Sequence, residues 1–547
     1  MRFSPGSVMI AATVLALAVR LFTLSRPGFL TQSTEYDDGV YLGAAIRLTQ
    51  GVMPYKDFAF VQPPGILLLM SPVALFARAT STVAGLALAR VLTVLASVAC
   101  VPLAGNLVRF RGTLVTALTC FILAIYPSDI AAAHTLLLEP WMNLLVLIAA
   151  NLAFSRGRLA PSVARLAWAG VLIGLAGVVK FWSGAPAFVL LVIVVLACRS
   201  AARQEAPGAW RRLVAYLGGL VAAFVVPLLP FAASAPHAFY RSTIVYQAAR
   251  VGTYTPLSLR LAHITGVIDV LDYWGRVTLS AGSNSVFGQA VDADTTPTTP
   301  HLLPFVASGL LVVIVAAGFY LARRSLTQAE WFSLFTCVGA LAAILGYSAF
   351  FYHYPAFPGP WLAILVAVSL GALIERGAAA WSGLPVRQLA VGAAGLVLTA
   401  ACVLQIAEVK GLATPKGNAE ISSLIPPGSC VVADEVALIV SANRFESSKP
   451  GCPVVLDSLA TTLVLAHGQS VQGGADRNKA AIAGWKAILL RAQYVWLSPN
   501  HWKRIPFGYN SAQWAWFTDH FRQIAPKVKP GQPDWIKGVG QLFVPKS

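Results

Sequence analysis

Long apolar stretches separated by short polar segments dominate the first three quarters of the chain. Each stretch holds about twenty residues, and a helix of that length crosses a hydrocarbon core about 30 Å thick. Backbone polar groups can be satisfied inside a bilayer by helices, so the pattern predicts a polytopic α-helical membrane protein. We expect about eleven spans, at residues 7–25, 82–105, 113–128, 140–154, 166–179, 183–198, 213–233, 303–322, 329–348, 357–375 and 388–406.

The charged residues support this topology. Of the 547 residues only 11% are charged, against about 25% in soluble domains, and the formal net charge is +18. The Arg residues gather in every second connecting segment, which the positive-inside rule places in the cytoplasm. The positive-inside rule therefore explains the net positive charge, and no nucleic-acid partner is expected. With a cytoplasmic N-terminus and an odd number of spans, the C-terminal segment lies outside. The Arg groups are Arg109/Arg111, Arg156/Arg158/Arg165, Arg199/Arg203/Arg211/Arg212, Arg323/Arg324 and Arg376/Arg387.

Two exterior loops, 26–81 and 234–302, are too long to be simple turns. Long loops on a rigid scaffold are where binding and catalytic residues concentrate. In the first loop, residues 37–48 predict a short amphipathic helix. The apolar stretch 65–77 is too short for a span and is expected to lie along the membrane surface or re-enter it. We include both loops in a transmembrane domain of residues 1–406.

The remaining residues, 407–547, predict a small extracytoplasmic α/β domain. Helix-like stretches at 434–443, 477–491 and 511–523 alternate with β-rich stretches at 430–432, 453–456, 494–497 and 541–544, which favours a largely parallel sheet. Cys430 and Cys452 are the two cysteines of this domain, and an oxidising compartment would allow them to form a disulfide. The sequence has no CxxC or Cys/His metal spacing, so no zinc site is expected.

The densest group of carboxylates is Glu35-Tyr-Asp-Asp-Gly-Val-Tyr41, directly after the first predicted span. Transfer of a sugar to a hydroxyl requires a base for the hydroxyl proton, and a positioned Asp can serve as one. A structural interpretation is equally open, since Thr34-x-x-Asp37 fits a helix capping box. The acidic pair Asp37 and Asp38 is also a candidate site for a divalent cation.

Further motifs follow the acidic pair in a fixed order. They are Gly51-Val-Met-Pro-Tyr-Lys-Asp57, Val61-Gln-Pro-Pro-Gly65, Leu136-Leu-Leu-Glu139-Pro140, Gly174-Leu-Ala-Gly-Val-Val-Lys180 and His353-Tyr354. Together, from about residue 35 to residue 375, they resemble the GT-C superfamily of membrane glycosyltransferases. The resemblance is to the protein O-mannosyltransferase and aminoarabinose transferase group, whose sugar donors are linked to polyprenyl phosphate.

The resemblance implies roles for individual residues. Asp37 is the expected catalytic base, with Asp38 orienting it or the sugar. The family's leaving group is a lipid phosphate, and we expect Lys180 and His353 to contact it. Arg241 and Arg250 break the positive-inside pattern in an exterior loop, and phosphate binding is one reason that they could do so. The residues expected to contact the substrates are Tyr41, Tyr55, Gln62, Glu139 and Tyr354. Gln62 stands where the aminoarabinose branch usually has Lys, which weakens the expectation of a phosphorylated acceptor.

Structural interpretations stay open for several of these residues. Lys180 could extend to the membrane surface, and Glu139 could stabilise the start of a helix. Arg241, Arg250 and their neighbour Arg260 could pair with Asp269 and Asp272 in a solvated loop. His353 could be structural.

These observations predict an enzyme of the cell envelope. It would transfer a sugar, such as mannose or arabinofuranose, from a polyprenyl-phosphate carrier to a hydroxyl of a glycan, lipid or protein. The reaction would occur by direct displacement on the outer face of the inner (plasma) membrane. The alternative is a transporter of lipid-linked sugars or solutes, which should place charges near the bilayer midplane and contain two related halves. Here the unusual charges gather at one face, except Arg20 and Arg90 in the first two spans.

Overall fold

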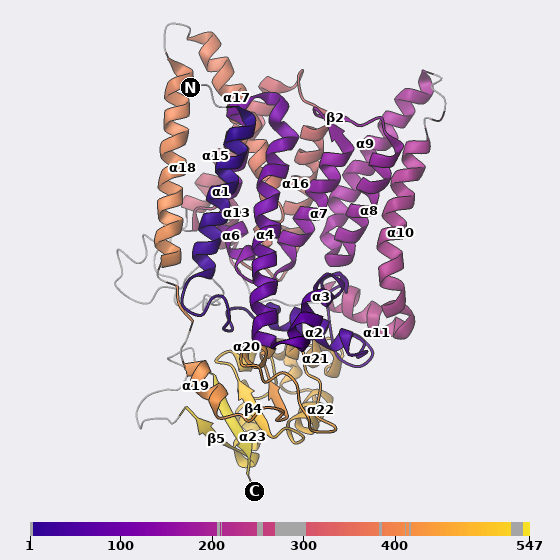
Figure 1. Ribbon diagram of the computed structural model, residues 1–547, viewed down its shortest axis with the longest axis vertical. Helices are drawn as coiled ribbons and strands as arrows, with labels where there is room; N and C mark the ends of the chain where they lie inside the picture. The colour runs from indigo at the N-terminus through magenta and orange to yellow at the C-terminus, as the bar shows by residue number, and fades with distance from the viewer. Residues whose placement is uncertain are drawn as a thin grey trace. The chain divides into compact units, whose positions relative to one another are not determined.

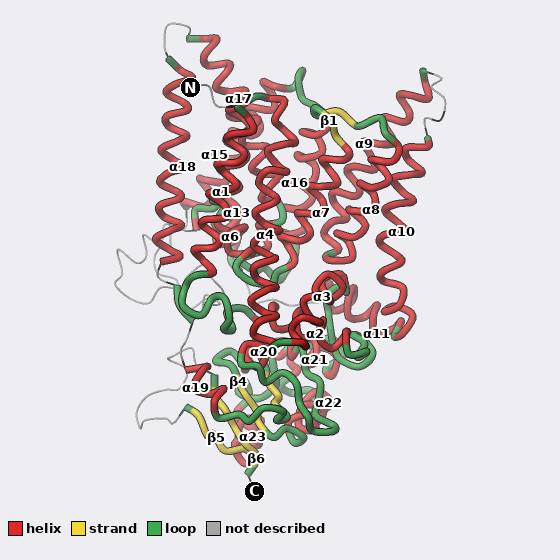
Figure 2. Tube along the Cα trace, in the orientation of Figure 1, coloured by secondary structure: helices red, strands yellow, loops and turns green. Residues whose placement is uncertain are grey.

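The computed structural model consists mainly of long helices followed by a C-terminal segment of short helices and strands (Figures 1 and 2). It describes residues 4–204, 208, 210–248, 255–268, 302–381, 385–410, 412–414, 417–526 and 540–546. The chain forms two compact units. The first, here called the helical unit, comprises Met1–Leu24, Leu92–Pro227 and Gly252–Leu412; the second, the mixed unit, comprises Ser25–Val91, Leu228–Val251 and Ala413–Ser547. Residues 25–91 and 228–251 therefore group with the C-terminal segment.

Each predicted span overlaps a helix. Among the described residues, eight helices are long and apolar enough to cross a membrane, and a ninth span results if the pair α5/α6, bent by 52°, counts as one. This is a multi-pass membrane protein. The helices α7 and α8 have 16 and 17 residues, so the total of eleven spans stays a prediction. The helices are α1 (Pro5–Leu24), α4 (Thr82–Val108), α5 (Thr113–Ala124), α6 (Pro127–Ala133), α7 (Leu138–Ala153), α8 (Val163–Val179), α9 (Gly184–Arg203), α10 (Arg211–Ser234), α15 (Leu303–Ala322), α16 (Gln328–Gly346), α17 (Gly359–Ala380) and α18 (Val386–Lys410), with α13 (Leu257–Thr265) and the strands β1 (Phe154–Ser155) and β2 (Arg158–Leu159) between them.

Arg20 stabilises the bend between α5 and α6. Its guanidinium, 1% exposed, donates to the carbonyl oxygen of Ala124 at the end of α5 (2.9 Å) and to the Asp129 carboxylate on α6 (2.5 Å). The interruption leaves backbone carbonyls without partners in their own helix, and Arg20 satisfies one of them. This charge inside the first span is therefore a structural ion pair.

The motif that ends at Lys180 brings two helices close together. Gly174 on α8 lies so near α10 that a Cβ atom there would stand 2.5 Å from the Leu220 carbonyl oxygen. Only glycine permits this approach. The helix then ends at Lys180, its C-terminal capping residue.

The mixed unit begins with the predicted amphipathic helix. This helix, α2 (Tyr36–Thr49), packs along α3 (Gly65–Ala79), the predicted surface stretch. The N-cap is Glu35, whose carboxylate accepts a hydrogen bond from its neighbour's backbone N–H, so the Thr34 capping box is not the cap used. The short helices α11 (Pro236–Tyr240), η3 (Arg241–Val245) and α12 (Tyr246–Ala248) also belong to this unit.

The C-terminal segment contains a four-stranded sheet in the order β3-β4-β6-β5. Only β3 and β4 are parallel, while β4–β6 and β5–β6 are antiparallel, so the prediction of a largely parallel sheet is wrong. Helices separate β3 from β4, as a parallel pair requires, whereas β5 and β6 are consecutive strands. The predicted strand 453–456 is a loop. The elements are α19 (Gly417–Ser423), β3 (Val431–Ala433), α20 (Val436–Ser441), α21 (Ser458–Leu465), α22 (Lys479–Leu489), β4 (Tyr494–Leu497), α23 (Ser511–His520), β5 (Phe521–Ala525) and β6 (Gln541–Pro545).

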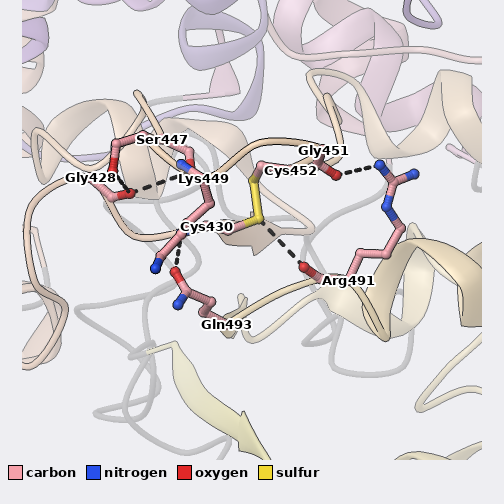
Figure 3. The surroundings of a disulfide bond; sticks show 9 residues. Gly428, Cys430, Ser447, Lys449, Gly451, Cys452, Arg491 and Gln493 are labelled. Carbon is pink, nitrogen blue, oxygen red and sulfur yellow. Dashed lines mark hydrogen bonds between the residues drawn. A yellow bond between two sulfur atoms is a disulfide. The ribbon is translucent and has the colours of Figure 1, made fainter.

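A disulfide joins Cys430, just before β3, to Cys452 in the following loop (Figure 3). The backbone N–H of Cys430 donates to the Gln493 side chain at 3.0 Å, and Arg491 donates to the carbonyl oxygen of Gly451. These contacts tie the loop to the segment that leads into β4.

Candidate functional site

The two acidic residues at the start of α2 point in different directions. Asp38 is fully buried and accepts hydrogen bonds from Arg90 at 2.5 and 3.1 Å. The same guanidinium donates to the Phe29 carbonyl oxygen and to the Thr34 hydroxyl. Arg90, the second charge that stood out within a predicted span, thus holds the start of α2 through Asp38.

Asp37 is half-buried and lines a pocket in the mixed unit. Within the described part of the chain, its carboxylate receives one hydrogen bond, from the Tyr41 hydroxyl at 3.2 Å, and has no salt-bridge partner. Because no cation among the described side chains neutralises it, this carboxylate is placed to accept a proton from a bound group. The pocket is lined by Tyr36, Asp37, Val40, Tyr41, Val61, Gln62, Asp457, Leu459 and Leu463.

The Gly51 and Pro-Pro motifs shape one wall of this pocket. Tyr55 has a φ of +67°, which is uncommon for a residue with a side chain, and its hydroxyl donates to the Gln62 carbonyl oxygen at 2.5 Å. Burial raises the pKa of Tyr55 well above its ordinary value, so it stays a hydrogen-bond donor. Tyr55 thus supports the backbone of Gln62, and the Gln62 side chain lines the pocket.

A second polar cluster lies in the helical unit and joins three distant motifs. The Glu139 carboxylate on α7 receives hydrogen bonds from Lys180 Nζ at 2.5 Å and from His353 Nδ1 at 3.0 Å. The Lys180 ammonium also lies 3.8 Å from the ring centroid of Trp182 and 4.4 Å from that of Tyr354. Lys180 is 7% exposed, so it does not reach water as a snorkelling side chain would.

This cluster, Glu139–Lys180–His353–Tyr354, places one carboxylate between two basic side chains. A buried ammonium in a membrane protein needs an anion or another polar partner. Glu139 supplies one negative charge, so the cluster carries a net positive charge when His353 is protonated. It could then bind an anionic group such as a phosphate.

The three basic residues of the second long loop have separate environments. Arg241 lies over the Tyr246 ring at 5.4 Å. Arg250 falls outside the described residues, as do Asp269 and Asp272. Arg260 donates to carbonyl oxygens at the end of α16, including that of Tyr347 at 2.7 Å. Such oxygens lack partners within their helix, so Arg260 has a structural role.

The C-terminal segment contributes to the pocket, which the sequence did not predict. Asp457 caps α21, accepting from the backbone N–H of Ala460, and it also accepts from the Tyr36 hydroxyl; both distances are 2.8 Å. An Asp before Ser458 and an apolar run is a helix-start signal that the sequence contains. The contact of Asp457 with Tyr36 could not be predicted, because the two residues are far apart in the sequence. Within the described ranges, no group of three or more His, Cys, Asp or Glu side chains is arranged to hold a metal ion.

Comparison with solved structures shows which fold the chain has. No family model and no curated protein sequence matches the chain. Among solved structures, ArnT from Cupriavidus metallidurans bound to undecaprenyl phosphate is similar over 98% of this chain and 97% of its own, with a TM-score of 0.55 and 14% sequence identity. The chain has the fold of the GT-C membrane glycosyltransferases.

Two further structures share this GT-C fold. ArnT in the apo state has a TM-score of 0.54 and 13% identity, with 98% of this chain and 97% of that chain covered. The archaeal oligosaccharyltransferase AglB from Archaeoglobus fulgidus, in complex with an inhibitory peptide and a dolichol-phosphate, has a TM-score of 0.50 and 15% identity, covering 91% of this chain and 69% of its own. At these identities the likeness concerns the fold alone.

Proposed function

We propose that this chain is a glycosyltransferase that moves a sugar from a polyprenyl-phosphate carrier to a hydroxyl acceptor. The observation that carries the proposal is Asp37, a carboxylate that lines a pocket, receives one hydrogen bond from Tyr41 and is not neutralised by a described cation. The GT-C fold supports it, because the solved structures with this fold include proteins bound to undecaprenyl phosphate and to a dolichol-phosphate.

In the proposed reaction Asp37 is the general base. It takes the proton of the acceptor hydroxyl as that oxygen bonds to the anomeric carbon, and the bond between the anomeric carbon and the phosphate oxygen breaks. The bonding electrons leave with the polyprenyl phosphate, and the anomeric configuration inverts. A positioned base of this kind contributes roughly 10²–10⁴-fold to a rate. Tyr41 orients the carboxylate, and Asp38 is occupied by Arg90.

For the donor phosphate we propose the Glu139–Lys180–His353–Tyr354 cluster. Negative charge develops on the leaving phosphate, and fixed cationic donors in a site shielded from water stabilise such charge strongly. Lys180 and His353 are buried and held in place by one carboxylate, so little reorganisation is needed. Arg241 and Arg250 stay candidates for the same phosphate.

Several finer points also stay proposals. The sugar is expected to be mannose or arabinofuranose, and the acceptor a glycan, lipid or protein on the outer face of the plasma membrane. A divalent cation at Asp37 and Asp38 stays a prediction, which chelation with EDTA during the assay would test. The ion pair between Asp38 and Arg90 leaves Asp37 as the more available ligand.

The test uses the full chain in lipid nanodiscs with a panel of polyprenyl-phosphate sugars, including mannose and arabinofuranose donors, and an envelope extract as acceptor. We expect one donor to yield free polyprenyl phosphate together with a glycosylated product. Movement of the carrier across proteoliposomes, with no transfer from any donor, would instead establish the transporter alternative.

A further inference from the structure

The C-terminal segment packs closely on the helix that carries Asp37. Gly39 on α2 lies against α20, where a Cβ atom would stand 2.2 Å from the backbone nitrogen of Ala437. A backbone atom cannot move aside as a flexible side chain can. The glycine of the Asp-Asp-Gly motif therefore allows two helices, separated by almost 400 residues in the sequence, to meet in the mixed unit.

A network of polar contacts fixes the residue next to Asp37. The Tyr36 hydroxyl donates to Asp457 at 2.8 Å and accepts from the backbone N–H of Leu459 at 3.2 Å. The Arg504 guanidinium covers the Tyr36 ring, 4.4 Å from its centroid. Burial, followed by the Asp457 charge, raises the pKa of Tyr36 well above its ordinary value, so Tyr36 keeps the proton that it donates.

Arg504 is itself held by the C-terminal segment. Its guanidinium donates to Glu435 at 2.6 Å and to Asp434 at 3.3 Å. Glu435 also accepts from the Ser33 hydroxyl at 2.8 Å. Residues of the C-terminal segment thus hold the chain both before and at the first turn of α2.

We propose that Asp457, Tyr36 and Arg504 form a clamp that positions Asp37, so that the C-terminal segment is a working part of the catalytic pocket. The inference rests on the proposed function of Asp37. Tyr36 and Asp37 are consecutive in the first helical turn, so a shift of the tyrosine moves the carboxylate. A displacement of about 1 Å from the reactive geometry can reduce a rate by about 10²-fold.

Three substitutions separate the clamp from general stability. Asp457→Ala removes the carboxylate that accepts from the Tyr36 hydroxyl, whereas Asp457→Asn keeps an oxygen that can accept from both Tyr36 and Ala460. Tyr36→Phe removes the hydroxyl and keeps the ring under Arg504. The matched control is Asn478→Ala, because Asn478 caps α22 in the same segment and contacts Ala480 and Ala481 instead of α2.

Turnover and hydrogen exchange are measured on the full chain in nanodiscs, with the donor that the wild type uses. We expect Asp457→Ala and Tyr36→Phe to lower kcat by about 10- to 100-fold with an unchanged KM for the donor. Asp457→Asn should recover most of kcat, and Asn478→Ala should match the wild type. Amide exchange over residues 36–49 should accelerate in Asp457→Ala and not in Asp457→Asn.

Two results would overturn the clamp. One is wild-type kcat and wild-type exchange in Asp457→Ala; the other is an Asp457→Asn variant as impaired as Asp457→Ala. Failure of the proposed function is recognised separately, by a wild type that transfers from no donor or by a fully active Asp37→Asn. In those cases the amide exchange over residues 36–49 still shows whether Asp457 holds α2 in place.

Discussion

At the scale of single residues, the two neighbouring carboxylates on α2 have different environments. Consecutive side chains on a helix point about 100° apart, so Asp38 faces Arg90 in the interior while Asp37 faces the pocket. The resemblance assigned Asp37 as the base and Asp38 as a residue that orients it or the sugar. It did not indicate that Asp38 pairs with Arg90, because the ion pair connects residues 52 positions apart in the sequence.

Replacement of Asp38 tests this division. Asp38→Asn leaves the buried Arg90 without a negative partner, and breaking a buried ion pair in this way costs about 3–5 kcal/mol. We expect a clear loss of thermal stability in detergent, while Asp37→Asn, at a half-buried position, changes stability little. An Asp38→Asn protein with unchanged stability and no transfer activity would instead assign Asp38 to the chemistry.

The charge of the pocket predicts which acceptors are used. Its described lining contains the carboxylates Asp37 and Asp457 and no Lys, Arg or His, so an acceptor that carries phosphate is disfavoured. A Gln62→Lys substitution would add a cation to the pocket lining. A lysine ammonium and an acceptor phosphate about 6 Å apart attract each other by about 1–3 kcal/mol at effective dielectric constants of about 80 to 20. We expect the ratio of kcat/KM for a phosphorylated over a neutral acceptor to rise at least about fivefold. Gln62→Met is the neutral control, and an equal rise in that variant would contradict the electrostatic explanation.

At the scale of elements, the sequence predicted the long helices and failed on the sheet. Apolar length alone marks a membrane helix, so all eleven predicted spans overlap helices. Strand pairing depends on residues far apart in the sequence. The predicted helix 511–523 ends within β5, so residues 521–523 were predicted as helix, yet they pair with β6. The loop at 453–456 has strand-like residues and no partner strand among the described ones.

The contact between α2 and α20 gives a prediction at this scale. Alanine is a better helix former than glycine by about 1 kcal/mol, so Gly39→Ala would stabilise α2 in isolation. In the folded chain its Cβ meets the backbone of Ala437, and we expect lower stability together with reduced transfer. Gly218→Ala on α10 is the control, since open space surrounds that position, and it should be neutral or slightly stabilising. Equal behaviour of the two variants would show that α2 and α20 do not pack so closely.

At the scale of the whole molecule, the motifs along the chain named candidate site residues, and their roles stay a prediction. Glu139 contacts both Lys180 and His353 in the helical unit, which the order of the motifs did not predict. The hydrogen bond between Tyr36 and Asp457 joins residues 421 positions apart, and no sequence pattern predicts it. The C-terminal segment was therefore expected to be a separate domain, while its residues help to line the Asp37 pocket.

The predicted topology can be tested directly. With a cytoplasmic N-terminus and eleven spans, a reporter fused after Ser547 should be active only outside the cytoplasm. The same reporter placed between α9 and α10, next to Arg203, should report the cytoplasm. Reversal of both readouts, or the same readout from both reporters, would contradict this topology.

The central claim, that Asp37 takes the acceptor proton, is tested most directly by single-turnover transfer with Asp37→Asn. Asparagine keeps the shape of the side chain and its hydrogen bond from Tyr41 while losing its basicity. We expect the rate of sugar transfer to fall by at least about 100-fold, with donor affinity unchanged in a separate binding measurement. A transfer rate equal to that of the wild type would show that Asp37 is not the base.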